Sequence, residues 1–154
     1  MRKMRLIDCE LSNEKALEIL QKGVFGTLAI SDVEGYAYSV PLNYVMLSDT
    51  LYFHCAKEGK KLEGIIKNPS VSFSVVTVSN IKDKEFTTEY ESVIVFGKAY
   101  KVEVEEEIMD TLKALILKYS PEYLSEGDLY IQKFKRATQV VGIKVSHFTA
   151  KAND

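Results

Sequence analysis

Residues 51–62 read LYFHCAKEGKKL, and this stretch joins the end of a predicted strand to the beginning of a predicted helix. The free backbone N–H groups and the positive dipole end at such a junction form a site suited to an anion. Lys60 and Lys61 fall in the first helical turn, where acidic residues are favoured unless an anion is bound. Two interpretations stay open: a phosphate site, or a basic helix face that four lysines between positions 57 and 67 keep solvated.

The sequence before this stretch predicts a helix followed by a hairpin. Apolar residues recur at helical spacing from position 12 to position 22, with Ser12 as the N-cap and Gly23 as the stop. Two strands follow, over Val24–Ser31 and Tyr36–Leu47, joined by a turn at 32–35. Pro41 removes one backbone donor from the second strand, which predicts an edge, a bulge or a ligand nearby.

The sequence after it predicts further strands interrupted by helices. The expected elements are strands over Leu51–Cys55, Val71–Val75, Glu91–Val104 and Thr138–Phe148, and helices over Gly59–Asn68, from Glu103–Glu107 to about Tyr119, and over Asp128–Arg136. Residues 79–88 have the composition of a polar excursion. The strand over Glu91–Val104 is apolar on both faces around residues 93–96, which predicts a central strand covered on two sides. This order favours a small antiparallel barrel over a βαβ sheet.

The composition is that of a single globular domain. The chain has 154 residues, of which 46% are hydrophobic and 27% charged, so we expect one domain over residues 1–154. A net charge of −2 argues against nucleic acid and against an anionic membrane as partners. Cys9 and Cys55 lack a CxxC or zinc-type spacing, which predicts reduced thiols and no metal site. Because the chain has neither a run of about 18 apolar residues nor a signal-type N-terminus, we expect a cytoplasmic protein.

His54 is the first candidate for chemistry, because it ends a strand beside the candidate anion site. It can donate to a ligand, move a proton, or act as a hydrogen-bonded structural residue. His147, on the last strand, either caps a sheet edge or approaches the same pocket. Strand alternation places Cys55 on the face opposite His54, which predicts a small buried thiol.

The sequence has no motif for hydrolytic or metal-dependent chemistry. It contains neither a GxSxG elbow nor an HExxH pair. The tyrosines of the first half either stack on a planar cofactor or pack in the core; they are Tyr36, Tyr38, Tyr44 and Tyr52. An enzyme with this sequence therefore needs a bound organic cofactor to supply its reactivity.

Several strings of sequence resemble a known superfamily. FGTLA at residues 25–29, GYAYSVPLNY at 35–44 and YFHCAKEGKKL at 52–62 together resemble the pyridoxamine 5′-phosphate oxidase-like FMN-binding split-barrel superfamily. Within that superfamily, FHCAKEGKK, YESVIVFGKA at 90–99 and KYSPEY at 118–123 are most similar to the nitroimidazole-resistance (Nim) proteins. The likeness spans nearly the whole chain.

The sequence also departs from the family pattern. The usual C-terminal His-x-Thr-Gly-Lys reads HFTAK at 147–151, so Ala150 replaces the glycine. Lys60 stands where arginine is common, and lysine binds phosphate as a point charge without the bidentate fork of arginine. True pyridoxamine phosphate oxidases carry a tryptophan and substrate-phosphate arginines near the C-terminus, whereas this chain has no tryptophan. The resemblance therefore does not extend to vitamin B6 oxidation.

The resemblance implies a mainly β fold, a six-stranded antiparallel split barrel with short flanking helices. It implies a homodimer that binds FMN at the subunit interface. The implied FMN contacts are Tyr38, Ser39, Val40, Pro41 and Asn43 at the isoalloxazine ring, His54, Cys55 and Ala56 beside the ribityl chain, Lys60 and Lys61 at the phosphate, and Glu91 and Ser92 from the partner chain. His54 is the candidate catalytic residue.

The activity that the resemblance implies is that of an FMN-dependent oxidoreductase similar to nitroimidazole or nitroaromatic reductases. NADH or NADPH donates electrons to the flavin, and the flavin passes them to a nitroaromatic or another small-molecule acceptor. An alternative stays open, because related split barrels bind haem or only carry or sense a cofactor. In that case His54 or His147 is an axial ligand.

Overall fold

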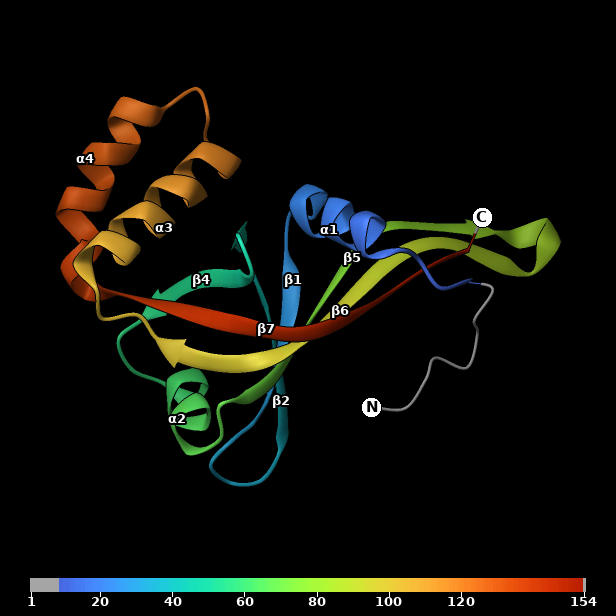
Figure 1. Ribbon diagram of the computed structural model, residues 1–154, viewed down its shortest axis with the longest axis horizontal. Coiled ribbons are helices and arrows are strands. Elements are labelled where there is room, and N and C mark those ends of the chain that lie inside the picture. Colours follow the sequence, from blue (N-terminus) through green and yellow to red (C-terminus); the bar gives the residue numbers. More distant parts are fainter. Residues whose placement is uncertain (1–8, 154) are drawn as a thin grey trace.

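A computed structural model describes residues 9–153 of the chain. Within that range seven antiparallel strands form one curved, open sheet in the order β2-β1-β5-β6-β7-β4-β3 (Figure 1). The strands are β1 Gly26–Ser31, β2 Ala37–Leu42, β3 Val45–Leu47, β4 Thr50–Ala56, β5 Ser70–Lys82, β6 Thr87–Lys101 and β7 Thr138–Asn153. The predicted split barrel is confirmed. It has seven strands instead of six because the long strand expected over Tyr36–Leu47 is divided at Asn43–Tyr44.

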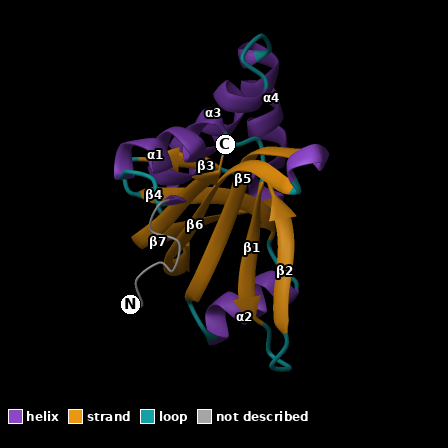
Figure 2. Cartoon of the chain, turned by 90° about the vertical axis from the view of Figure 1, so that its right-hand side faces the viewer, coloured by secondary structure: helices purple, strands orange, loops and turns teal. Residues whose placement is uncertain are grey.

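Four α-helices of the described range surround this sheet. Helix α1, Asn13–Lys22, and helix α2, Lys60–Lys67, lie at opposite ends of the barrel (Figure 2). Helices α3, Glu105–Tyr119, and α4, Leu124–Phe134, pack on each other beside β3, β4 and β7. Helix α1 begins as predicted, since the Ser12 hydroxyl accepts a hydrogen bond from the amide of Lys15 at 3.3 Å.

Side-chain alternation along the strands creates two separate hydrophobic cores. The barrel interior contains Leu28, Phe73 and Val95, all 0% exposed, together with the apolar side of α1. The second core lies outside the barrel, where Tyr52 and Val140 pack beneath Leu115 of α3. Burying one such side chain contributes roughly 1.5–3 kcal/mol, so both cores contribute to stability.

The outer face of the sheet is therefore divided into two halves. The covered half carries Val45, Tyr52 and Val140, which lie beneath α3 and α4, and the exposed His54 lies at its margin. The open face carries the outward side chains of the other strands: Thr27, Ala29, Ser39, Pro41, Ser72, Ser74, Val76, Ser92, Ile94, Phe96, His147 and Thr149. The buried side chains of the four helices belong to the two cores, so no helix of residues 9–153 covers the open face.

The strand register arranges the open face in rows, because residues opposite each other in antiparallel strands point to the same side. One row contains, in order, Pro41, Thr27, Ser74, Ile94 and Thr149. The next row contains Ser39, Ala29, Ser72, Phe96 and His147. Small side chains thus leave the β2-β1-β5 part of these rows without large projections, and larger ones stand on β6 and β7.

Two local expectations were wrong. Residues 79–88 are not a polar excursion, because β5 and β6 continue to pair there, with Ser79 opposite Tyr90 and Lys82 opposite Thr87. Cross-strand pairing and the turn at Asp83–Glu85 overrule the polar composition. The strand expected over Glu91–Val104 is central, but Ile94 on its outer face is 37% exposed, so nothing in the described chain covers that side. Pro41 does lie on an edge strand, as its missing donor predicts.

Candidate functional site

The junction between β4 and α2 has the geometry of an uncapped helix start. Gly59 precedes the helix with a φ of 121°, a conformation that other residues rarely adopt, and no side chain caps the first turn. The amides of Leu62 and Glu63 both donate to the Gly59 carbonyl, at 2.9 and 3.2 Å. The amides that precede them have no acceptor within the helix and remain available to an anion.

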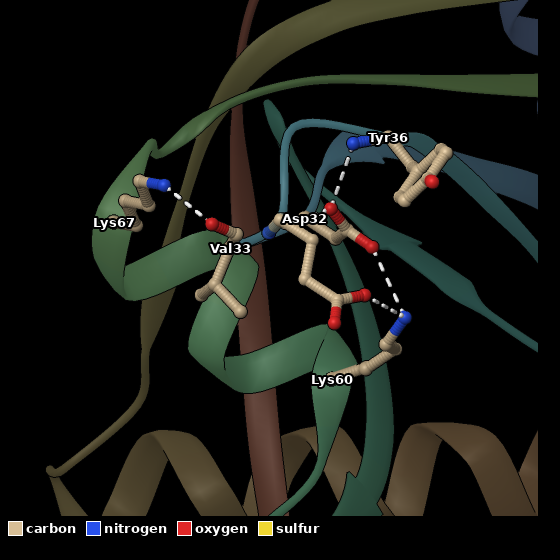
Figure 3. Close-up of polar contacts among 6 residues, drawn as sticks. Asp32, Val33, Tyr36, Lys60 and Lys67 are labelled. Carbon is tan, nitrogen blue, oxygen red and sulfur yellow. Dashed lines mark hydrogen bonds and ion pairs between the residues drawn. The ribbon is translucent and has the colours of Figure 1, made fainter.

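Lys60 fastens this helix start to the turn between β1 and β2 (Figure 3). Its Nζ lies 3.1 Å from Oδ2 of Asp32 and 3.0 Å from Oε2 of Glu34. The other oxygen of Asp32 accepts hydrogen bonds from the amides of Glu34 and Tyr36, at 2.9 and 2.8 Å. Lys67, at the opposite end of α2, donates to the Val33 carbonyl at 2.7 Å. Both ends of the helix are therefore held on one hairpin turn.

The environment of Asp32 keeps its carboxylate charged. Burial alone would raise the pKa of this side chain, which is 1% exposed. Hydrogen bonds from the Tyr36 amide, Lys60 and the Glu34 amide outweigh burial, so the pKa of Asp32 lies below its usual value. Close packing also holds α2 against the end of β1, since a Cβ added to Gly64 would lie 2.9 Å from the Ser31 carbonyl oxygen.

Lys61 differs from Lys60 in its electrostatic surroundings. No ion pair joins Lys61 to a carboxylate of residues 9–153. Burial raises the pKa of the Cys55 thiol, and the nearby Lys61 ammonium opposes that increase. Lys61 therefore lies near the end of β4 with an uncompensated charge, whereas two carboxylates already neutralise Lys60.

The predicted ring-binding residues of β2 point to two sides of the sheet. Tyr38 and Val40 pack against the barrel core, and Ser39 and Pro41 point outward on the open face. Asn43 follows the strand, and its Nδ2 donates to the Val24 carbonyl at 2.9 Å. Only part of the predicted group can therefore present side chains to a ligand on the open face.

His54 and Cys55 lie on opposite faces of β4, as alternation predicts. Cys55 packs against the barrel core, and His54, which is exposed to solvent, lines the edge of an apolar cavity of about 80 Å³ beneath α3 and α4. Burial lowers the pKa of His54, which favours the neutral imidazole. His147 does not share this cavity. Its ring stacks on Phe96 of the open face, with centroids 4.7 Å apart, and its buried Nε2 has no partner in the described chain.

Glu91 and Ser92 are far from β2 within one chain. Strands β1 and β5 lie between β2 and β6, and Ser92 points to the open face. Glu91 points to the other side, where its Oε2 accepts a hydrogen bond from the Thr77 hydroxyl at 2.9 Å. A single chain therefore does not bring these two residues to the ring-binding residues of β2.

A known protein family matches nearly the whole chain. The family described as pyridoxamine 5′-phosphate oxidase matches residues 12–152. The chain belongs to this family. None of the curated proteins matches it.

Solved structures of split-barrel proteins share the fold at low sequence identity. A proposed 5-nitroimidazole antibiotic resistance protein from Bacteroides thetaiotaomicron is 23% identical, with a TM-score of 0.76 over 92% of this chain and 85% of that one. An FAD and heme binding protein from Mycobacterium smegmatis is 18% identical, with a TM-score of 0.79 over 93% and 72%. An FAD-binding protein from Mesorhizobium loti is 20% identical, with a TM-score of 0.66 over 94% and 97%. Flavin and haem thus both occur among proteins of this split-barrel fold.

One contact of this family member was not foreseen from its sequence. The Tyr119 hydroxyl accepts a hydrogen bond from the Tyr44 amide at 3.0 Å and lies 2.8 Å from the Val24 carbonyl oxygen. Lys118 Nζ lies 4.0 Å above the Tyr44 ring, and burial lowers its pKa to about 8. The end of α3 thus fixes the corner between β2 and β3. The string KYSPEY at 118–123 was the available signal, but its contacts lie about 75 residues away in the sequence.

The residues of this split barrel place groups suited to a phosphate-bearing flavin near the turn between β1 and β2. Lys61 and the free amides of α2 suit a phosphate. The turn that holds Lys60 leads directly into β2, whose outward Ser39 and Pro41 are next to Ala29 and Thr27.

Among residues 9–153, no helix is long and apolar enough to cross a membrane.

Proposed function

We propose that this chain is a flavin-dependent oxidoreductase that binds FMN between two copies of itself. It transfers electrons from NADH or NADPH to a nitroaromatic or another small acceptor. The observation that carries the proposal is the uncompensated Lys61 charge at an uncapped helix start, held in place beside an edge strand that opens onto a flat, uncovered face.

The phosphate end of the proposed site uses charge and backbone donors together. A phosphate monoester carries about −1.5 to −2 charges near neutral pH. Lys61 and the free amides of the first turn of α2 supply complementary donors. Lys60 contributes by fixing the helix start to Asp32, so its role is to position the donors. This division follows from the ion pairs and was not visible in the KK dipeptide.

The ring end of the proposed site uses the small side chains of the open face. An isoalloxazine ring is planar and needs a flat surface. Ser39, Ala29 and Ser72 form such a surface in one row, and Pro41, Thr27 and Ser74 form it in the next. When bound, the flavin supplies the hydride and electron transfer that none of these side chains can perform. The chain holds the ring, excludes water from one side of it and offers hydroxyl groups to its polar edge.

A second copy supplies the missing cover in this proposal. The open face exposes Val76 at 54% and Ile94 at 37%, in the middle of strands rather than at their ends. Joining two such faces by a twofold axis buries both residues and brings Ser92 of each copy toward the other, whereas Glu91 points away from this interface. An obligate interface of this kind buries on the order of 2,000 Å² or more. Folding, dimerisation and flavin binding are then coupled.

The His54 cavity gives little support to haem as the cofactor. The cavity volume of about 80 Å³ is comparable to the volume of a few water molecules, at roughly 30 Å³ each, and is far smaller than the volume of a porphyrin. His147 is stacked on Phe96 on the open face, which is already assigned to the flavin ring and the partner. The proposal therefore favours flavin over haem.

Spectroscopy of the purified full chain tests the proposal. We expect one non-covalent FMN per subunit, seen as a broad blue absorption, and bleaching of that band when NADH or NADPH is added. We also expect the melting temperature to rise with protein concentration and with added FMN. Absence of flavin binding in folded protein, or an intense violet haem band instead, would refute the proposal.

A further inference from the structure

A groove larger than the His54 cavity lies beside the β4–α2 junction, and the proposed flavin site does not use it. Its volume is about 550 Å³, within the range of roughly 300–1,000 Å³ that is usual for small-molecule sites. The walls come from the loop after β4, the beginning of α3, and the turn at Lys135–Ala137 that leads into β7. Val102 and Ile108 line it with apolar surface, and Lys57, Lys135, Arg136 and Glu103 surround that surface.

The cations of this groove differ in whether they are already paired. Lys135 forms an ion pair with Glu105 at the edge of α3. Lys57 and Arg136 form no ion pair with any carboxylate of residues 9–153, although both line the groove. Two uncompensated cations that approach one groove from different elements suit a ligand with two adjacent negative charges. Arginine adds a planar fork that binds a phosphate through two hydrogen bonds.

The position of the groove relates it to the flavin site without merging the two. Lys57 belongs to the loop that connects Ala56, the last residue of β4, to Gly59 at the start of α2. Ala56 pairs with Thr138, which lines both this groove and the His54 cavity. The groove therefore begins where the proposed phosphate site ends, and it continues toward His54.

We propose that this groove binds the nucleoside diphosphate half of a dinucleotide. Lys57 and Arg136 bind the pyrophosphate, Ile108 contacts the purine base, and the Glu103 carboxylate accepts hydrogen bonds from ribose hydroxyls. The proposal rests on the proposed function, because a dinucleotide has a role here only beside a flavin site. Two sources offer the same chemistry: the nicotinamide dinucleotide donor, and FAD whose flavin half occupies the proposed FMN site.

Calorimetric titration of the full chain with ADP, at fixed ionic strength, tests the shared chemistry. Arg136→Gln and Lys57→Ala each remove one charged partner of the pyrophosphate, so each should raise the Kd for ADP roughly tenfold or more. Lys113→Ala removes an exposed lysine of α3 that makes no ion pair in the described chain, and it should leave the Kd unchanged. Arg136→Lys keeps the charge and should lie between wild type and Arg136→Gln.

Two further measurements identify the source. If the donor occupies the groove, Arg136→Gln raises the Kd for NADP⁺ while the flavin released by heating the purified protein keeps its amount and identity. If FAD occupies it, wild type releases FAD, and Arg136→Gln releases less FAD or FMN instead. Either result supports the groove as a nucleoside diphosphate site.

Three outcomes overturn the proposal. They are no detectable ADP binding by a wild type that releases no FAD on heating, equal Kd values for wild type and both folded variants, and a loss of FMN affinity in Arg136→Gln as large as the loss of ADP affinity. The last outcome would assign these cations to the flavin phosphate. Failure of the proposed function looks different, because the wild type would then lack flavin binding whatever the state of the groove.

Discussion

The covered half and the open face belong to one sheet and one register, yet they differ in side-chain size. Val45, Tyr52 and Val140 of the covered half are 8%, 8% and 1% exposed beneath α3 and α4. The open face carries serine, threonine, alanine and proline on three neighbouring strands, with Ile94 and Phe96 beside them. The large apolar side chains of the covered half pack against α3 and α4. The small side chains of the open face leave room for a planar ligand and for a second copy of the chain. Under the proposed function, this contrast assigns stability to the covered half and binding to the open face.

The largest expected effect comes from placing a charge on the open face. Ile94→Glu should weaken the dimer by more than about 100-fold, because an uncompensated buried charge costs about 3–5 kcal/mol. Light scattering should then show a mass near one chain at concentrations where the wild type is a dimer, with loss of bound flavin. Leu129→Glu on α4 is the matched control, since Leu129 is 72% exposed and lies away from this face. A dimer that survives Ile94→Glu would show that the open face is not the interface.

Truncation of a covered-half contact should instead reduce the stability of the single chain. Leu115 is 6% exposed in the core beneath α3, so Leu115→Ala should cost about 2–5 kcal/mol of unfolding free energy in a urea titration. Leu117→Ala, on the same helix but 60% exposed, should change stability by less than about 0.5 kcal/mol. Equal effects of the two substitutions would mean that α3 does not pack on the sheet as described.

Sequence reasoning predicted this contrast only in part. Period-two patterns and turn residues were enough to predict most of the strands and an antiparallel barrel, because those signals are local. They could not show that Lys60 is paired and Lys61 is not, since Asp32 and Glu34 lie 28 and 26 residues from Lys60. The family resemblance implied a position for His54 beside a flavin but could not show the α3–α4 cavity that His54 lines, because helices from later in the chain create that cavity. Tertiary partners decide the role of a charged side chain, and one sequence does not show its partners.

The next effect should separate the two lysines of the helix start. Lys61→Ala should weaken FMN binding roughly 10- to 100-fold, because a hydrogen bond to a charged group contributes about 1.5–3 kcal/mol. Lys67→Ala should change the Kd by less than about threefold, since Lys67 donates to the Val33 carbonyl at the far end of α2. Lys60→Ala should lower the melting temperature, because it leaves the buried Asp32 carboxylate without its cation. Equal losses of FMN affinity from Lys61→Ala and Lys67→Ala, at controlled salt, would mean that the stretch is only a solvated basic face.

The smallest effect on stability should come from His54, which tests whether the covered half is purely structural. His54 faces a cavity instead of a filled core, so His54→Ala should fold and lose less than about 1 kcal/mol, while the reduction rate of bound flavin changes.

The pH dependence of stability gives an independent measure of the same residue. Burial lowers the pKa of His54, so the unfolded chain binds more protons at this residue than the folded chain. The contribution of the neutral imidazole is therefore complete above its unfolded pKa of about 6.5 and is lost as pH falls through the lower folded value. His54→Gln should flatten the fall in stability below that pH. A loss of several kcal/mol in His54→Ala, with an unchanged flavin spectrum and reduction rate, would make His54 a core residue and restrict chemistry to the open face.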